Sequence, residues 1–109
     1  MTMQLPPPIS RYFEADRGEP VEAVLACFAD EAVVKDEGQV HRGHDAIRAW
    51  KIGATKKYNY TVEPLAIGTD KGRHVVTSHL VGDFPGSPVD LRYFFVLDGD
   101  KISELEITL

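Results

Sequence analysis

From Tyr58 onward the chain alternates strand-like segments with short turn sequences, and this pattern constrains the fold more than any other feature. Four segments rich in β-branched and aromatic residues cover residues 60–67, 74–83, 89–97 and 101–109. Each joint between them carries Gly, Asp or Pro and is short enough for a hairpin. The sequence therefore predicts four strands in an antiparallel meander, with a bulge or a sheet edge at Pro64.

The first half of the chain has the periodicity of helices. Three stretches carry apolar residues at combinations of i, i+3, i+4 and i+7, the spacing of a helix that buries one face. The first begins near Ile9 and ends at Gly18, the second follows Pro20 for about ten residues, and the third opens at Gly43. Their apolar positions are Ile9, Tyr12 and Phe13, then Val21, Val24, Leu25 and Phe28, then Ile47, Trp50 and Ala54. A strand at residues 32–36 and a return strand at residues 39–42 separate the last two helices, which predicts an α+β domain.

Composition indicates one ordinary globular domain. The chain has 109 residues, of which 43% are apolar and 27% charged, a balance typical of folded domains. A chain of this length can form one core without disulfides or a structural metal. Residues 1–8 end in three consecutive prolines, which favour an extended backbone. We therefore expect a flexible tail over residues 1–8 and a single domain over residues 9–109.

Charge and hydropathy argue against nucleic acid and membranes as partners. The formal net charge is −5, and no basic block occurs along the chain. Every apolar run, including the one at residues 94–97, is far shorter than the ~20 residues that span a bilayer. Residues 1–8 lack the basic start and apolar stretch of a secretory signal, so the sequence predicts a cytoplasmic protein.

The spacing of histidine and cysteine residues does not predict a metal site. Cys27 is the single cysteine, which excludes an internal disulfide and a multi-cysteine zinc site. His41 and His44 straddle a strand end and a helix start instead of one helical face. His74 and His79 are five residues apart on a predicted strand and point to opposite faces. We expect these histidines at the surface or at a pocket edge.

Asp36 is the most informative polar residue. Period-2 counting places it on the same strand face as Ala32 and Val34, the face expected to turn toward the core. Burial disfavours the charged form of a carboxyl group, which is the tuning that a general base near neutral pH needs. In the alternative interpretation the strand ends there and Asp36 caps the turn at Glu37 and Gly38, because Asp before Gly is common in turns. Spacing alone leaves both interpretations open.

Two tyrosines lie on predicted apolar surfaces. Tyr12 belongs to the apolar stripe of the first helix. Tyr93 shares its strand face with four apolar residues, Val89, Leu91, Phe95 and Leu97. A buried phenol needs a hydrogen-bond partner or lines a cavity, although either tyrosine can also be an ordinary core residue. One carboxylate and two phenols on an apolar face are the composition expected of a pocket for a mostly apolar ligand.

Three sequence segments carry a resemblance to a known superfamily. They are Arg-Tyr-Phe at residues 11–13 with the stop at Gly18, LACFADEAVVKD at residues 25–36, and RGHDAIR at residues 42–48. Their succession resembles the nuclear transport factor 2-like superfamily, and within it the branch of ketosteroid isomerases and SnoaL-like polyketide cyclases. The resemblance implies a curved antiparallel sheet wrapped around three helices of the N-terminal half. This cystatin-like α+β barrel is a cone whose open end is a pocket, and its members pair as homodimers through the sheet.

The resemblance also implies roles for individual residues. In the isomerase branch, an aspartate at the end of the first strand removes a proton next to a ketone. A tyrosine of the first helix and a protonated aspartic acid of a late strand stabilise the enolate. Carried over by position, the base matches Asp36 and the helix donor matches Tyr12. The place of the protonated acid falls on Tyr93, which departs from the steroid isomerases but can donate the same kind of hydrogen bond.

The leading hypothesis is a small-molecule pocket protein of the SnoaL-like type that needs no cofactor. Asp36 would be the general base, and Tyr12 and Tyr93 would be the oxyanion donors. An apolar small molecule is the expected ligand, held by the wall residues Val34, Trp50, Phe84, Phe95 and Leu97.

Two other hypotheses remain open. The rival is a non-catalytic ligand-binding or dimerisation module in which Asp36 caps a turn and the tyrosines only pack. An epoxide hydrolase is a third hypothesis, and its chemistry needs a second carboxylate and an arginine around a water. Asp90 and Arg92 fall on the strand face opposite Tyr93, which disfavours it.

Overall fold

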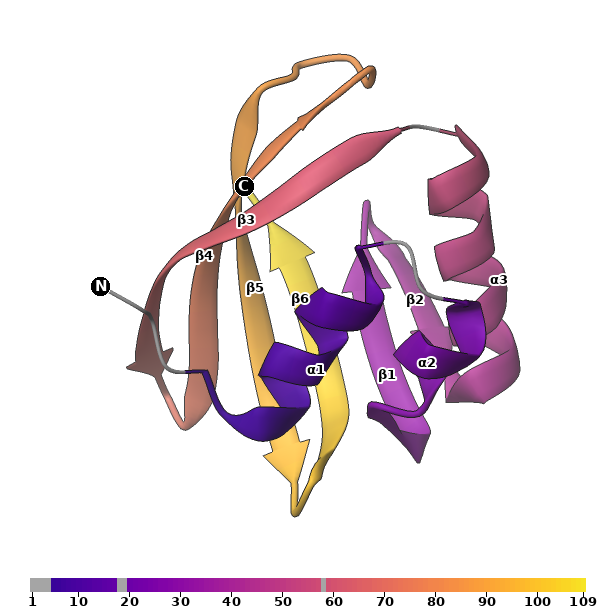
Figure 1. Cartoon of the computed structure of the whole chain (residues 1–109). Coiled ribbons are helices and arrows are strands. Elements are labelled where there is room, and N and C mark those ends of the chain that lie inside the picture. The colour runs from indigo at the N-terminus through magenta and orange to yellow at the C-terminus, as the bar shows by residue number, and fades with distance from the viewer. Residues whose placement is uncertain (1–4, 18–19, 58) are drawn as a thin grey trace.

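The computed structural model describes residues 5–17, 20–57 and 59–109, which form a six-stranded curved sheet and three helices (Figure 1). The helices are α1 (Pro7–Ala15), α2 (Val21–Leu25) and α3 (Gly43–Lys57). The strands are β1 (Phe28–Asp36), β2 (Gln39–Arg42), β3 (Tyr60–Asp70), β4 (Arg73–Gly82), β5 (Val89–Asp98) and β6 (Lys101–Thr108). The expected α+β class, with its helices in the N-terminal half and a curved sheet, is confirmed.

The strand order is β2-β1-β6-β5-β4-β3. The meander from β3 to β6 is antiparallel as predicted, and so is the hairpin of β1 and β2. β1 and β6 pair in parallel, with Val34 opposite Leu105. The sheet is therefore mixed, whereas the resemblance implied an antiparallel one. No hairpin joins β1 to β6, so no local turn fixes their relative direction.

Helix α1 lies within the curve of the sheet, in front of β5 and β6 in Figure 1. Its apolar stripe forms the centre of the core, as its i, i+3, i+4 spacing predicts. The Tyr12 ring packs edge-on against Phe28 and Phe95, each with a centroid distance of 5.8 Å. Phe13 packs against Tyr93 at 5.3 Å. These aromatic contacts fix α1 on the sheet, and α3 packs against β1 and β2.

The start of α1 differs from the prediction. The helix begins at Pro7, two residues before the expected start of the domain at Ile9. Proline is tolerated there because the first-turn N–H groups have no partner within the helix. The helix ends at Ala15 with Asp16 as the C-cap residue. The predicted stop at Gly18, and residues 1–4 of the predicted tail, lie outside the described residues.

The second helix is shorter than its apolar stripe predicts. α2 ends at Leu25, and Phe28, the expected fourth member of the stripe, is the first residue of β1. The backbone N–H of Ile102 donates to the Cys27 carbonyl at 2.8 Å, and Phe28 pairs with Ile102 on β6. Pairing with a strand distant in sequence thus overrides the local helical period at Phe28.

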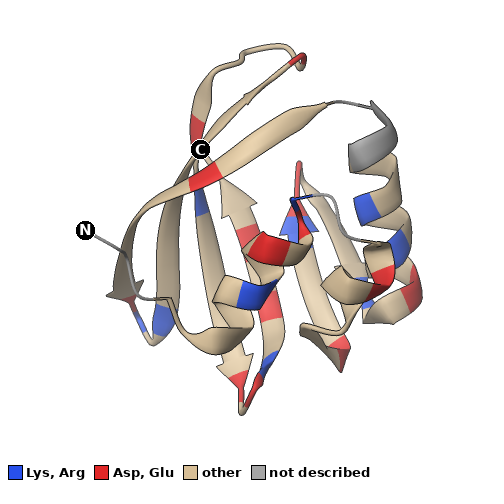
Figure 2. Cartoon of the chain, viewed as in Figure 1, with Lys and Arg blue, Asp and Glu red and all other residues tan. Residues whose placement is uncertain are grey.

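The expectations for Pro64 are confirmed. β3 is an edge strand, and its register with β4 shifts between Pro64 and Ala66, as at a bulge. Figure 2 shows acidic and basic positions interspersed over helices and strands. In the part of the chain that the structure describes, no helix is long and apolar enough to cross a membrane.

Candidate functional site

A cavity of about 270 Å³ lies between the helices and the sheet. Its walls combine apolar residues with a few polar ones, and the lining is Tyr12, Asp36, Glu37, Trp50, Lys51, Ala54, Tyr60, Leu80, Phe84, Pro85, Val89, Leu91, Tyr93 and Ile107. The volume is near the lower end of the range for small-molecule pockets in general.

Asp36 is the last residue of β1, on the inward strand face that period-2 counting predicts. Ala32 and Val34 on that face are 1% and 0% exposed, and Asp36 follows them into the cavity. Trp50 Nε1 on α3 donates to Asp36 Oδ2 at 2.9 Å. Among the described side chains, this is the one hydrogen bond to the carboxylate. The second oxygen, Oδ1, is therefore available to a bound molecule.

The turn after Asp36 forms without a hydrogen bond from the aspartate side chain. Glu37 and Gly38 both have positive φ, 52° and 75°, as in the two-residue turns that join antiparallel strands. Asp36 and Gln39 pair across the hairpin. In the described structure the Asp36 carboxylate bonds Trp50 and makes no bond to the turn backbone. The geometry therefore favours the cavity interpretation of Asp36 over the turn-cap interpretation.

Tyr12 and Tyr93 reach the same cavity from α1 and β5. They are 0% and 4% exposed. Burial raises the pKa of Tyr12 well above its ordinary value, and the charge of Asp16 raises it further. Burial likewise raises the pKa of Tyr93, with smaller contributions from Asp16, Tyr60 and Asp36. Both phenols therefore stay protonated at neutral pH and remain hydrogen-bond donors. The structure brings Asp36, Tyr12 and Tyr93 to one cavity.

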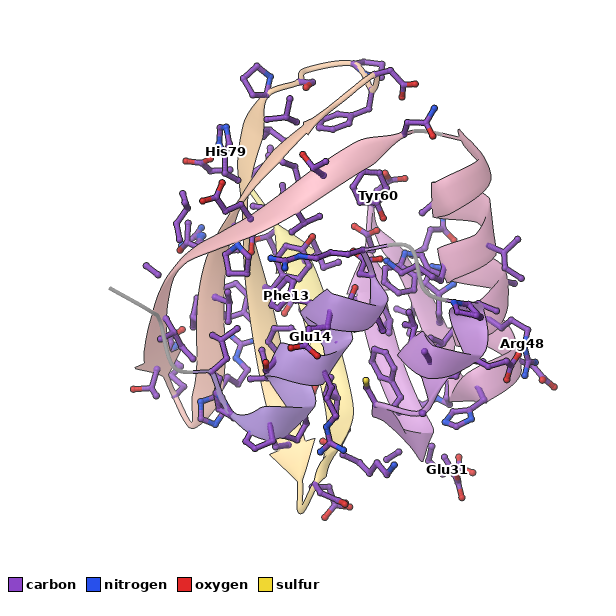
Figure 3. All side chains as sticks on the ribbon, viewed as in Figure 1. Phe13, Glu14, Glu31, Arg48, Tyr60 and His79 are labelled. Atoms are coloured by element: carbon purple, nitrogen blue, oxygen red, sulfur yellow. The ribbon has the colours of Figure 1, made fainter. Side chains whose placement is uncertain are left out.

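Three polar residues of the cavity, Glu37, Lys51 and Tyr60, are missed by the sequence analysis. Lys51 Nζ donates to Asp16 Oδ1 at 2.7 Å and to the Tyr12 hydroxyl oxygen at 3.4 Å. Figure 3 shows Tyr60 in the space between the start of β3 and the helices. Lys51 follows Ile47 by four residues and so lies on the apolar stripe of α3, which is the signal that could have identified it.

The expected wall residues divide into two groups. Trp50 and Phe84 line the cavity, whereas Val34, Phe95 and Leu97 do not. Val34 and Phe95 are 0% exposed. The cavity opens beside the first half of β5, and α1 covers the strand farther along, where Tyr12 contacts Phe95. Leu97 lies beyond Phe95 on β5, next to the register shift between Val96 and Leu97 in the pairing of β5 with β6.

The cavity walls that spacing did not predict are mostly apolar. Tyr93 shares the lining with residues from β4, β5, β6 and the joint after β4, namely Leu80, Pro85, Val89, Leu91 and Ile107. Val89 and Leu91 belong to the strand face that the sequence predicts, but alternation does not show which members of a face border a cavity.

Two histidines, His44 and His79, have polar partners outside the cavity. A ring nitrogen of His44, Nε2, lies 3.0 Å from the Phe28 carbonyl oxygen, and Nδ1 of His79 lies 2.6 Å from Asp90 Oδ1 on the exposed sheet. Within residues 5–17, 20–57 and 59–109, no three His, Cys, Asp or Glu side chains are grouped to hold a metal ion.

Comparison with known families and structures agrees with this architecture. The family model of the SnoaL-like domain matches residues 9–105. The chain belongs to the SnoaL-like domain family. Among the curated proteins, none matches this SnoaL-like domain.

Solved structures give the same fold. A proposed polyketide cyclase from Sinorhizobium meliloti is 40% identical, with 95% of each chain covered and a TM-score of 0.90. A protein from Catenulispora acidiphila with a ketosteroid isomerase-like fold, solved with trimethylamine, is 17% identical. It covers 97% of this chain and 87% of its own, with a TM-score of 0.83. A cystatin-fold protein from Novosphingobium aromaticivorans is 16% identical, covers 99% of this chain and 100% of its own, and has a TM-score of 0.77. The last two are similar in fold alone.

Proposed function

We propose that this SnoaL-like domain catalyses proton transfer at a carbon next to a carbonyl group of a small, mostly apolar molecule. One observation carries the proposal: the Asp36 carboxylate, anchored by Trp50, opens into the same cavity as the protonated phenols of Tyr12 and Tyr93. A carboxylate base beside neutral hydrogen-bond donors is the arrangement that enolate chemistry needs.

The proposed reaction balances without a cofactor. Asp36 takes the proton from the carbon, and the electron pair of the C–H bond moves toward the carbonyl oxygen. The resulting enolate oxygen accepts hydrogen bonds from the phenols of Tyr12 and Tyr93. Return of the proton to another carbon gives an isomer. Attack of the enolate carbon on a second carbonyl of the same molecule closes a ring, and the alkoxide that forms takes the proton back from Asp36. Ring closure is in keeping with the relative from Sinorhizobium meliloti named a proposed polyketide cyclase.

Proton exchange on a model ketone tests the proposal without the natural substrate. The probe is 2-tetralone, a two-ring ketone whose α-protons exchange with D₂O and are followed by NMR. We expect the wild-type chain to accelerate exchange over free solution, and Asp36→Asn to reduce the enzymatic rate about 100-fold or more. Glu37→Gln is the matched control, because Glu37 is the neighbouring carboxylate, in the turn that follows Asp36, and also lines the cavity.

Each result of this experiment decides between the hypotheses. Loss of exchange in Asp36→Asn with retention in Glu37→Gln supports Asp36 as the base. Equal exchange rates in wild type and Asp36→Asn remove Asp36 from the mechanism. Binding of 2-tetralone without any accelerated exchange favours the non-catalytic ligand-binding module.

The remaining expectations about this protein stay predictions. They are a homodimer formed through the sheet, an apolar ligand in the cavity, and a cytoplasmic location. The homodimer is accessible to sedimentation measurements over a range of protein concentrations.

A further inference from the structure

Lys51 is a buried cation at the wall of the cavity. Its side chain is 6% exposed, and its Nζ forms an ion pair with Asp16 Oδ1 at 2.7 Å. The Asp16 side chain is 3% exposed and does not line the cavity, so Asp16 holds the ammonium group from outside. Burying both charges costs free energy that an exposed pair would not cost. A role in the cavity would account for keeping a lysine at this position.

The groups around Lys51 come from four elements. Its Nζ donates to the Tyr12 hydroxyl oxygen at 3.4 Å and lies 4.5 Å from the centre of the Trp50 ring. Burial raises the pKa of Tyr60, and the Lys51 charge and a hydrogen bond with Lys51 act in the opposite direction. Two carboxylates also act on these phenols: the charge of Asp16, and to a smaller extent that of Asp36 on β1, raises the pKa of both Tyr12 and Tyr60. The cavity thus has the carboxylates of Asp36 and Glu37 in its lining and a fixed ammonium in the wall.

We propose that Lys51 is a positioning residue of this site, which orients the phenols of Tyr12 and Tyr60 and selects ligands that carry negative charge on oxygen, the class of enolates and phenolates. This inference rests on the proposed function, because an enolate is the species that proton removal by Asp36 would form. Lys51 acts on the bound enolate through Tyr12 and Tyr60.

The hydrogen-bond geometry supports the orienting role. A phenol oxygen that accepts a hydrogen bond from an ammonium group must direct its own O–H proton elsewhere. The rings of Phe13, Phe28 and Phe95 pack against the Tyr12 ring and offer no comparable acceptor. A ligand oxygen in the cavity that Tyr12 lines can accept this proton.

The charges of the reaction support the selecting role. Before proton transfer, the negative charge is on Asp36, and afterwards Asp36 is neutral and the charge is on the ligand oxygen. The ammonium of Lys51 stays fixed by Asp16 throughout. A fixed cation in a site of low dielectric stabilises nearby negative charge more than it would in water. The side chain in Asp36→Asn is neutral, like the protonated Asp36 carboxyl group after proton transfer. This variant is therefore the background in which anion binding is measured.

The test uses 4-nitrophenol, whose neutral and anionic forms have different absorbance spectra. In the Asp36→Asn chain, we expect the ratio of bound anion to bound neutral phenol to exceed the ratio in free solution at the same pH by about tenfold or more. Adding Lys51→Met together with Asp16→Asn should abolish this excess, and the paired change avoids leaving Asp16 buried without its partner. Lys51→Arg should retain most of it, because the positive charge remains.

Two further variants separate a role in the site from a structural one. Tyr60→Phe in the same background should lower the anion ratio, because Lys51 acts in part through that phenol. Lys71→Met removes one positive charge from the exposed turn after β3 and should leave the ratio unchanged. Circular dichroism shows whether each variant is folded.

The outcomes are distinct from those of the ketone experiment. Preferential binding of neutral 4-nitrophenol by Asp36→Asn, or an anion ratio unaffected by the Lys51→Met and Asp16→Asn pair in a folded chain, would overturn the proposal. Should the paired variant fail to fold, an unchanged ratio in Tyr60→Phe overturns it equally. Exchange on 2-tetralone reports on Asp36 as the base, so failure of the proposed function is distinguishable from failure of the role given to Lys51.

Discussion

At the scale of single residues, the site depends on one hydrogen bond between a strand and a helix. Asp36 ends a strand, Trp50 lies in the middle of a helix, and the indole N–H holds one carboxylate oxygen at 2.9 Å. A carboxylate that bonds through one oxygen keeps the other for a ligand. The bond therefore orients the proposed base and leaves its second oxygen available to accept a proton.

Trp50→Phe should lower the free energy of unfolding by about 1–2 kcal/mol, because the carboxylate loses its charge-assisted hydrogen bond. The rate of 2-tetralone exchange should fall as well, since Asp36 is no longer held in one orientation. Urea denaturation followed by circular dichroism measures the stability, because Trp50 is the single tryptophan and its fluorescence is lost in the variant.

Asp36→Asn is the matched control for this stability measurement. Its amide oxygen can still accept from Trp50, so its stability should stay close to that of the wild type. Equal stability of Trp50→Phe and the wild type would show that the hydrogen bond contributes nothing to folding.

At the scale of elements, the pairing of β3 with β4 determines where Tyr60 lies. Tyr60 opens β3 opposite Gly82, the last residue of β4. A Cβ atom added at Gly82 would lie 2.7 Å from Tyr60 Cβ and would overlap the Asn59 carbonyl oxygen. The glycine thus permits a close approach of two backbones, and that approach brings the Tyr60 phenol to the cavity.

Gly82→Ala should lower the free energy of unfolding by about 1–3 kcal/mol, because the methyl group forces the start of β3 away from β4. It should also weaken the binding of 4-nitrophenolate by displacing Tyr60. Urea denaturation and absorbance titration measure the two effects.

Gly68→Ala on the same strand provides the comparison, because no atom lies within 4 Å of its added Cβ. We expect this variant to keep both the stability and the 4-nitrophenolate binding of the wild type. A Gly82→Ala chain as stable as Gly68→Ala would contradict the role given to the close approach.

At the scale of the whole molecule, buried tyrosines link the stability of the fold to alkaline pH. The pKa of Tyr12 and that of Tyr93 are both raised, chiefly by burial. In the unfolded chain, a tyrosine ionises near pH ~10. Above that pH the folded state therefore binds more protons than the unfolded state, and stability falls as the pH rises. Below it both states are protonated, and these groups cause no change with pH.

The free energy of unfolding should therefore fall as pH rises above about 10, by up to about 1.4 kcal/mol per pH unit for each of the two tyrosines until the folded phenols ionise. Urea denaturation between about pH 9 and about pH 11 measures this slope. The double variant Tyr12→Phe, Tyr93→Phe should have a shallower slope. A slope identical to that of the wild type would show that other groups control alkaline unfolding.

Much of the fold follows from local sequence patterns. Alternation of apolar and polar residues predicts the strands and places Ala32, Val34 and Asp36 on the inward face, because side chains of a strand alternate strictly. The helical spacing in α1 and α3 predicts which faces are buried, and Pro64 predicts the bulge at the sheet edge. The candidate base and both phenols can be named from these patterns and from the resemblance to a known superfamily.

Only the tertiary structure decides which residues meet. Lys51 and Asp16 are 35 positions apart, and no periodicity relates them. The parallel pairing of β1 with β6 draws Phe28 out of its helical stripe, and α1 covers Phe95 while leaving Tyr93 at the cavity. Local patterns fix the face on which a side chain lies because they depend on neighbours in the chain. The partner of that side chain depends on packing between distant segments, and so the cavity walls and the Lys51–Asp16 pair are set by the fold.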